Sequence, residues 1–107
     1  MAIPEIVQPA TGLGGGLNIG INDVNGPASY VTGGVLVSAS QLGLAAVKFA
    51  EPMGLSSDGL NFCKIISPSG KSSATFKILW FVQATGAEVA PTTALNTKKI
   101  RCFGLGI

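Results

Sequence analysis

Residues 73–83 read Ser73-Ala74-Thr75-Phe76-Lys77-Ile78-Leu79-Trp80-Phe81-Val82-Gln83, and this stretch decides the fold. Its even-numbered positions are all apolar, whereas its odd-numbered positions are polar at the two ends and in the first half. An alternation with a period of two predicts a β-strand with one face on a core. We therefore expect the side chains on the even face to point inward, namely Phe76, Ile78, Trp80 and Val82.

Leu79 and Phe81 give the same strand a second apolar face at its centre. A strand that is apolar on both faces is covered either by a second layer or by a partner chain. We predict the central strand of an antiparallel sandwich in which Leu79 and Phe81 contact other copies of the chain. A closed homo-oligomer, preferably a trimer, would cover them.

The length of 107 residues predicts one domain, and the composition gives it few charges. Hydrophobic residues make up 47% of the chain and charged residues only 11%, against about 25% in an average globular domain. A weakly charged surface is typical of a protein that sits on another protein. The net charge of +2 predicts no nucleic-acid partner, because nucleic acids demand a denser basic stripe. We also expect no membrane span and no signal peptide.

The 15 glycines and six prolines favour many short strands joined by tight turns. We predict an all-β fold, a small antiparallel β-sandwich of jelly-roll-like type, with about six or seven strands. The remaining extended segments are 17–23, 28–37 with a break at Gly33-Gly34, 45–50, 60–67 and 98–105. The segment 60–67 and the central strand form a hairpin through 68–71. Ser38 and Gly43 are expected to cap one short helical turn.

Two of these segments predict which side chains share a face. In 45–50, Val47 and Phe49 face one way, and Lys48 and Ala50 face the other. In 98–105, Ile100 and Cys102 occupy one face, and Lys99, Arg101 and Phe103 occupy the other.

The N-terminal residues 1–16 differ from the predicted sandwich domain of residues 17–107. Two prolines and four glycines oppose regular pairing there. The segment is either a frayed terminus or an extended arm that orders against a neighbouring subunit. For the arm, the side chains expected to bind the partner are Ile3, Pro4, Ile6 and Val7.

The sequence predicts no enzymatic activity and no cofactor or metal. It contains no histidine, which removes the usual histidine-dependent nucleophile pairs and most zinc sites. Gly70-Lys71-Ser72 is similar to the end of a phosphate-binding loop, but Ile65 stands where that motif needs glycine. The five carboxylates are scattered. Cys63 and Cys102 are expected to be buried and reduced, with a disulfide between them as the alternative.

One charge cluster stands out, with Lys98, Lys99 and Arg101 close together near the C-terminus. Such a cluster is either a solvated strand face or a docking contact to an acidic partner surface.

Several short pieces together resemble a known family. They are Tyr30–Gly34, Val37–Leu44, Gly86–Leu95, Ile100-Arg101 and Phe103–Gly106. In this order and spacing, the chain resembles the capsid decoration, or cement, proteins of tailed bacteriophages and related small virion proteins. The resemblance covers roughly residues 28–49 and 84–106.

The resemblance implies a β-sandwich that trimerises on the outer surface of the phage head, where it binds the major capsid protein and stabilises contacts between its subunits. It also implies a virion protein assembled in the host cytoplasm. A head-fibre, tail or adaptor subunit of the same virion class is the alternative. An enzyme or small-ligand carrier would need convergent polar groups in a pocket.

Overall fold

The computed structural model describes residues 17–67 and 73–107, and these fold into two antiparallel sheets of three strands each. The predicted all-β sandwich is confirmed. The predicted arm at 1–16, with Ile3, Pro4, Ile6 and Val7, lies outside the described residues, as does the turn at 68–71. The elements are β1 (Asn18–Asn25), β2 (Val35–Ser38), the 3₁₀ helix η1 (Ala39–Leu42), β3 (Val47–Pro52), β4 (Asn61–Ile66), β5 (Thr75–Val82) and β6 (Lys99–Gly106).

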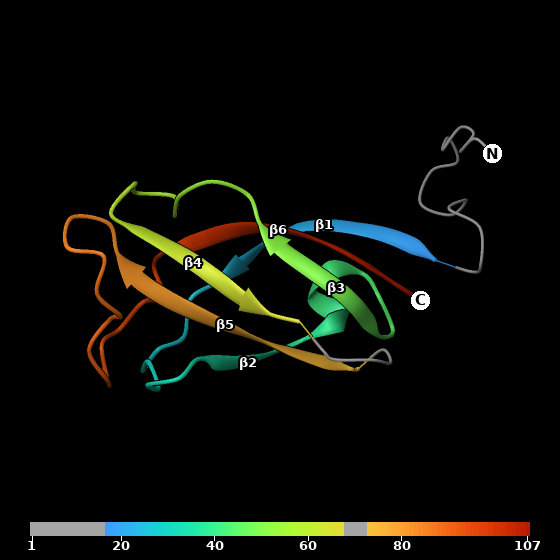
Figure 1. Cartoon of the computed structure of the whole chain (residues 1–107), viewed down its shortest axis with the longest axis horizontal. Helices are drawn as coiled ribbons and strands as arrows, with labels where there is room; N and C mark the ends of the chain where they lie inside the picture. The colour runs from blue at the N-terminus through green and yellow to red at the C-terminus, as the bar shows by residue number, and fades with distance from the viewer. Residues whose placement is uncertain (1–16, 68–72) are drawn as a thin grey trace.

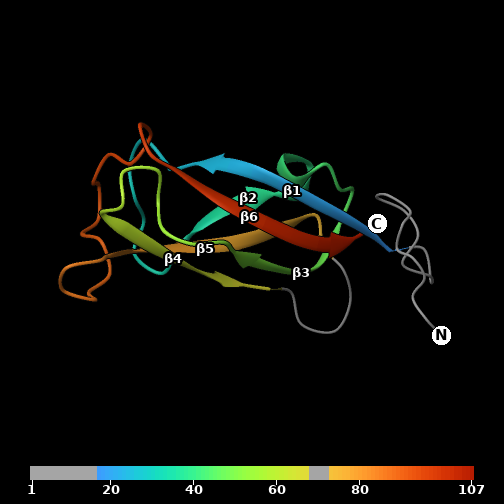
Figure 2. The ribbon, with the colours of Figure 1, turned by 90° about the horizontal axis from the view of Figure 1, so that it is seen from above.

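The two sheets lie one above the other, with the strand orders β1-β6-β3 and β2-β5-β4 (Figure 1). Seen from above, β6 runs along the middle of the upper sheet (Figure 2). Strand β5 is the centre of the lower sheet, as residues 73–83 predicted, and it pairs with β4 as the expected hairpin. The other connections along the chain pass between the two sheets.

The core is formed by the inner faces of the two central strands. Phe76, Ile78 and Trp80 of β5 are 3%, 1% and 1% exposed, as the alternation predicted. Ile100 and Cys102 of β6 face them and are fully buried. Val82 is partly buried and packs against this core, whereas Ala74 precedes the strand and is exposed.

The predicted alternation in 45–50 is wrong beyond its first residues. The pairing of β3 with β6 shifts register between Val47 and Phe49, which is a β-bulge. A bulge places one extra residue in a strand and reverses the faces that follow. As a result Ala50 is buried beside Val47, and Phe49 is 37% exposed.

The predicted strand at 28–37 is mostly a loop, because only β2 pairs. Gly33 and Gly34 have φ values of 94° and 110°, which interrupt an extended chain. Upstream of them, Tyr30 pairs through its backbone with a loop: its N–H donates to Thr93 and its carbonyl accepts from Thr92, at 2.9 and 2.8 Å.

The short helical turn is confirmed, with Ser38 as its N-cap and Gly43 ending it at a φ of 77°. This turn packs against the inner face of the upper sheet at positions that carry no side chain. A Cβ on Gly20 would lie 1.9 Å from the carbonyl oxygen of Leu42, and one on Gly104 would lie 2.9 Å from Cδ1 of Leu42. The described residues include no helix long and apolar enough to cross a membrane.

Candidate functional site

The outer face of the β2–β5–β4 sheet is apolar at its centre and carries two lysines. We call it the lysine face. The register of the two strand pairs places nine side chains on it. They are Leu36, Ser38, Phe62, Lys64, Ile66, Thr75, Lys77, Leu79 and Phe81.

Leu79 and Phe81, predicted to contact other copies of the chain, lie on the lysine face and are partly exposed. Phe81 stacks on Phe62 of β4, with ring centroids 5.1 Å apart and planes within 9° of parallel. At the edges of the face, Leu36 is 67% exposed and Ile66 is 50% exposed. The predicted apolar patch is therefore present and wider than the two residues that indicated it.

The outer face of the β1–β6–β3 sheet is also apolar over much of its area. We call it the balanced face, because its charges are of both signs. Its outward positions follow from the register with β6. They are Ile19, Ile21, Asp23, Asn25, Phe49, Glu51, Lys99, Arg101, Phe103 and Leu105.

Phe49 and Phe103 meet edge to face on the balanced face at a centroid distance of 5.9 Å. Ile21, opposite Phe103, is 59% exposed. Sequence reasoning missed this surface, because apolar residues alternating with glycine and asparagine in β1 are normally assigned to the inside. The signal that could have found it is the glycine pair Gly104 and Gly106, which marks the inner face as filled by another element.

The predicted charge cluster is divided by the structure. Lys98 is an inward-leaning side chain that pairs with Asp58 at 3.1 Å and donates to Oδ1 of Asn61 at 2.5 Å. Arg101 lies on the balanced face and pairs with Asp23 at 2.8 Å. Lys99 lies on the same face and is exposed. A docking contact through all three cations at once does not fit this arrangement.

The carboxylates in these pairs are held in their charged form. The backbone N–H of Leu60, the hydroxyl of Ser56 and then Lys98 lower the pKa of Asp58 to about 2. The guanidinium of Arg101 lowers the pKa of Asp23. Hydrogen bonds to the charged form of a carboxyl favour that form.

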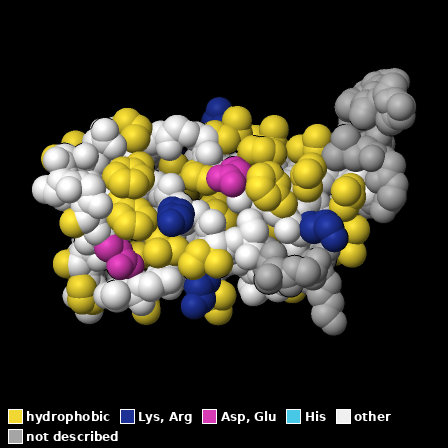
Figure 3. All heavy atoms as spheres, in the orientation of Figure 1, with side chains coloured by type: hydrophobic (Ala, Val, Ile, Leu, Met, Phe, Trp, Pro, Cys, Tyr) yellow, Lys and Arg dark blue, Asp and Glu magenta, His cyan; other side chains and the backbone are white. Residues whose placement is uncertain are grey.

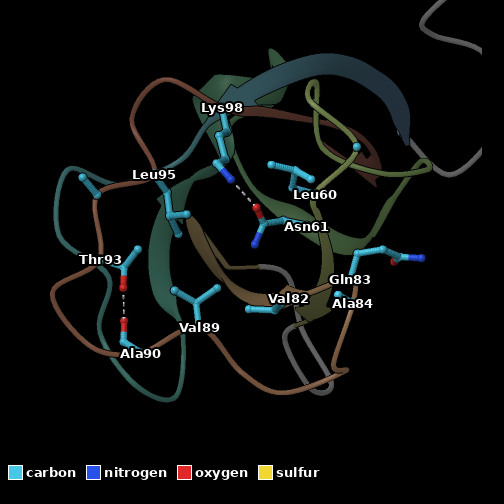
Figure 4. A pocket seen from close by; sticks show the side chains of 12 residues that line it. Leu60, Asn61, Val82, Gln83, Ala84, Val89, Ala90, Thr93, Leu95 and Lys98 are labelled. Atoms are coloured by element: carbon cyan, nitrogen blue, oxygen red, sulfur yellow. Dashed lines mark hydrogen bonds between the residues drawn. The ribbon is translucent and has the colours of Figure 1, made fainter.

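A hollow of about 560 Å³ opens at the end of the sandwich where β4 begins and β5 ends (Figure 4). Leu60, Val82, Val89 and Leu95 give it a mostly apolar lining. Asn61, Thr93 and Lys98 of this lining are already bonded, and Gln83 is its remaining polar side chain. Lys98 donates to Asn61, Asn61 donates to the carbonyl of Phe81 at 3.0 Å, and Thr93 donates to the carbonyl of Ala90 at 2.8 Å.

Cys63 and Cys102 are both free and buried, as predicted. Burial raises the pKa of the Cys63 thiol and raises that of Cys102 to about 12, so neither is a ready nucleophile at neutral pH. Among residues 17–67 and 73–107, no group of three or more potential ligands from His, Cys, Asp and Glu is placed to hold a metal ion.

Comparison of the chain with protein-family models, with curated proteins and with solved structures finds no significant match. A function is therefore inferred from the sequence resemblance and from the two outer faces of the sandwich. Viewed from one side of the sandwich, hydrophobic side chains cover much of the surface, and the charged side chains are few and separated (Figure 3).

Proposed function

We propose that the chain is a non-enzymatic virion structural protein of the decoration, or cement, class. In this role it binds the outer surface of a tailed-phage head and stabilises contacts between major capsid subunits. The observation that carries the proposal is the presence of partly apolar outer faces on both sheets. An antiparallel sheet usually keeps one face polar and in water, and exposed apolar patches of this kind mark interaction sites.

Two apolar faces supply contacts for two kinds of neighbour. They lie on opposite sides of one sandwich, so a head-to-tail contact between them builds an open stack and not a closed ring. A closed oligomer, which we propose to be a homotrimer, then uses one face and leaves the other for the shell. The second face gives a decoration protein its attachment surface.

The arm at 1–16 remains part of this proposal through its sequence. An extended segment of that length reaches up to roughly 50 Å. Ile3, Pro4, Ile6 and Val7 would add contacts on a second subunit, and such linked contacts raise the total affinity without enlarging the domain. Nucleic acid and membrane are not among the proposed partners.

The alternative is a head-fibre, tail or adaptor subunit of the same virion class. The opposite placement of the two apolar faces favours this reading specifically, because a contact between them repeats along a line. The two proposals differ in where the protein sits on the particle and in whether it forms closed or open assemblies.

The deciding experiment combines light scattering of the purified chain with electron cryo-microscopy of phage shells that lack it, before and after its addition. We expect a closed oligomer of about three copies and new density on the icosahedral shell. Shells that carry the protein should also resist heat better than bare shells. Density confined to the tail, or open filaments in solution, would favour the alternative and exclude the decoration role.

Deleting residues 2–12 tests the arm separately. We expect lower occupancy on the shells and an unchanged far-ultraviolet circular dichroism spectrum. Full occupancy with normal heat resistance would show that the sandwich alone makes the attachment.

A further inference from the structure

We propose that the lysine face is the site for a different protein, and that its occupant is an amphipathic α-helix whose apolar stripe is flanked by carboxylates. This inference deepens the proposed function, on which it rests for the origin of the partner, by naming the chemistry that the partner presents. It also assigns self-association to the balanced face, in place of the contact between copies that the sequence predicted for Leu79 and Phe81.

The dimensions of the lysine face match one helix. Three strands about 4.8 Å apart place the axes of the two outer strands about 10 Å from each other, which is about the diameter of a helix with its side chains. Strand β5 contributes eight residues along the face, or roughly 26 Å at about 3.3 Å per residue. A helix of about 18 residues covers that length. Helices packed on one face of an antiparallel sheet are a standard layer arrangement.

The apolar side chains of the lysine face form a central band for such a stripe. Phe81 and Leu79 lie on the middle strand, with Phe62 paired to Phe81 across β4. Leu36 on β2 and Ile66 on β4 extend the band to both edges and are the most exposed members. At about 25 cal/mol per Å² of apolar surface, covering this band is favourable for any partner of matching shape.

The charges decide which partner fits. Lys64 pairs with Leu79, and Lys77 pairs with Ile66, so the two lysines are diagonal neighbours across β4 and β5. Both are exposed, and the outward positions of β2, β4 and β5 carry no carboxylate. Glu88 lies opposite Phe81 just beyond the end of β2, so one carboxylate borders this face, and it already accepts hydrogen bonds from the Tyr30 hydroxyl and the Gly33 N–H. With Lys64 and Lys77 against this one carboxylate, the face keeps an excess of positive charge.

A second copy is a poor occupant of this face, because it would bring two more lysines and, from its outward strand positions, no carboxylate to pair with them. Like charges brought face to face cost affinity, whereas complementary charges speed and direct association. The balanced face carries Asp23 and Glu51 beside Lys99 and Arg101, so copies of the chain can meet there without excess charge of one sign.

Single-stranded nucleic acid is the other partner that aromatic rings and lysines on a sheet can bind. The rings of Phe62 and Phe81 are stacked on each other, so part of the surface on which a base would lie is already covered. Two lysines are also few for a phosphate backbone. The observations therefore favour the acidic helix.

The test uses the full chain labelled with ¹⁵N and a lactam-bridged helical peptide of about 18 residues with a leucine stripe flanked by glutamates. A second peptide has lysine at each glutamate position. We expect the glutamate peptide to shift the backbone amides of β2, β4 and β5, and the lysine peptide to bind more weakly by on the order of tenfold. The double variant Lys64→Glu/Lys77→Glu should reverse this preference.

The matched control is Lys48→Glu, set against Lys64→Glu alone, because each changes the net charge equally at an exposed position and Lys48 lies off the lysine face. It should keep the preference for the glutamate peptide. The proposal is overturned by no shifts at millimolar peptide, by equal binding of both peptides, by shifts confined to the balanced face, or by tighter binding of a (dT)₁₅ oligonucleotide to the lysine face. It is also overturned if Lys64→Glu/Lys77→Glu, with a dispersed amide spectrum, breaks the chain's own oligomer.

Shell binding separates this inference from the proposed function. Peptide binding with no density on shells would contradict the decoration role and leave the chemistry of the face intact. Shell binding that is unaffected by Lys64→Glu/Lys77→Glu would contradict the lysine face as the attachment site and leave the decoration role intact.

Discussion

The hydroxyl of Tyr30 donates a hydrogen bond of 2.6 Å to the carboxylate of Glu88, 58 residues further along the chain. The same hydroxyl accepts the backbone N–H of Trp80 at 3.2 Å. Strand β2 pairs with β5 only as far as Ile78, so Trp80 lies past the end of β2. Tyr30 therefore supplies the hydrogen-bond partner that a longer strand would have provided.

Glu88 completes this junction from the other side. Its carboxylate also accepts the N–H of Gly33 at 2.8 Å, and the bond from Tyr30 followed by that from Gly33 lowers the pKa of Glu88. The next residue, Val89, donates its N–H to the carbonyl of Trp80 at 2.9 Å. The loop that contains Val89 and lines one side of the hollow at the end of the sandwich is thus fixed to the central strand.

The first prediction is that Tyr30→Phe destabilises the fold by about 1–3 kcal/mol. The phenylalanine keeps the buried ring but leaves the N–H of Trp80 without its partner, and an unpaired buried donor costs about that much. Urea unfolding followed by tryptophan fluorescence measures the change. Val31→Ala, at an exposed position of the same loop, is the control and should change stability by less than about 0.5 kcal/mol.

The second prediction concerns alkaline pH. Burial, and then the bond to Glu88, raise the pKa of Tyr30 to about 12 from its ordinary value of 10.0. Because the folded value is the higher one, the stabilisation from neutral Tyr30 is complete below pH 10 and is lost as pH rises to about 12. The free energies of unfolding of the natural chain and of Tyr30→Phe should therefore approach each other as pH rises through this range. Absorbance at 295 nm that shows phenolate forming with a midpoint near pH 10 in the folded chain would contradict this.

The third prediction concerns acid. Hydrogen bonds from Leu60 and Ser56, and then Lys98, lower the pKa of Asp58 to about 2 in the folded chain from its ordinary value of 3.8. A depressed folded value stabilises the protein above pH 4, and this contribution is lost as pH falls from about 4 toward 2. Asp58→Asn should therefore flatten the acid limb of stability against pH. An unchanged acid limb, measured by thermal unfolding between pH 2 and 6, would show that the charged carboxylate of Asp58, with its bonds from Leu60, Ser56 and Lys98, contributes nothing.

The sequence predicted the inner face of the fold well and the outer faces poorly. The alternation around Trp80 identified the central strand, its buried side and the hairpin with β4, because large apolar side chains at a period of two have few other solutions. Leu79 and Phe81 likewise indicated the lysine face. Pairing partners outside the hairpin were not predictable, since strand order depends on contacts between segments far apart in the chain.

The balanced face escaped prediction for a physical reason. In β1, Gly20 faces inward and Ile21 faces water, which reverses the usual assignment of apolar residues to the core. The reversal is possible because Leu42 of η1 fills the space that a side chain at position 20 would occupy. A bulge between Val47 and Phe49 reverses the second half of β3 in a similar way, and no glycine or proline stands at the bulge itself to mark it.

The fourth prediction follows from that packing. Gly20→Ala places a methyl group 1.9 Å from the carbonyl oxygen of Leu42, so the backbone of η1 or of β1 must move. Overpacking of this kind typically costs about 1–3 kcal/mol. Asn25→Ala, at an exposed position of the same strand, is the control and should be close to neutral. Equal stability of the two variants in urea unfolding would show that η1 does not pack rigidly on the sheet.

The fifth prediction tests the central strand itself. Trp80 is 1% exposed between the two sheets, and replacing a fully buried tryptophan with alanine typically costs about 3–5 kcal/mol. Trp80→Phe keeps an aromatic ring in the same place and should cost markedly less. Comparing the two variants therefore separates the loss of packed volume from the loss of the indole ring itself. Because tryptophan fluorescence is absent from both variants, unfolding should be followed by circular dichroism. A cost below about 1 kcal/mol for Trp80→Ala would place this side chain at the surface and contradict the sandwich.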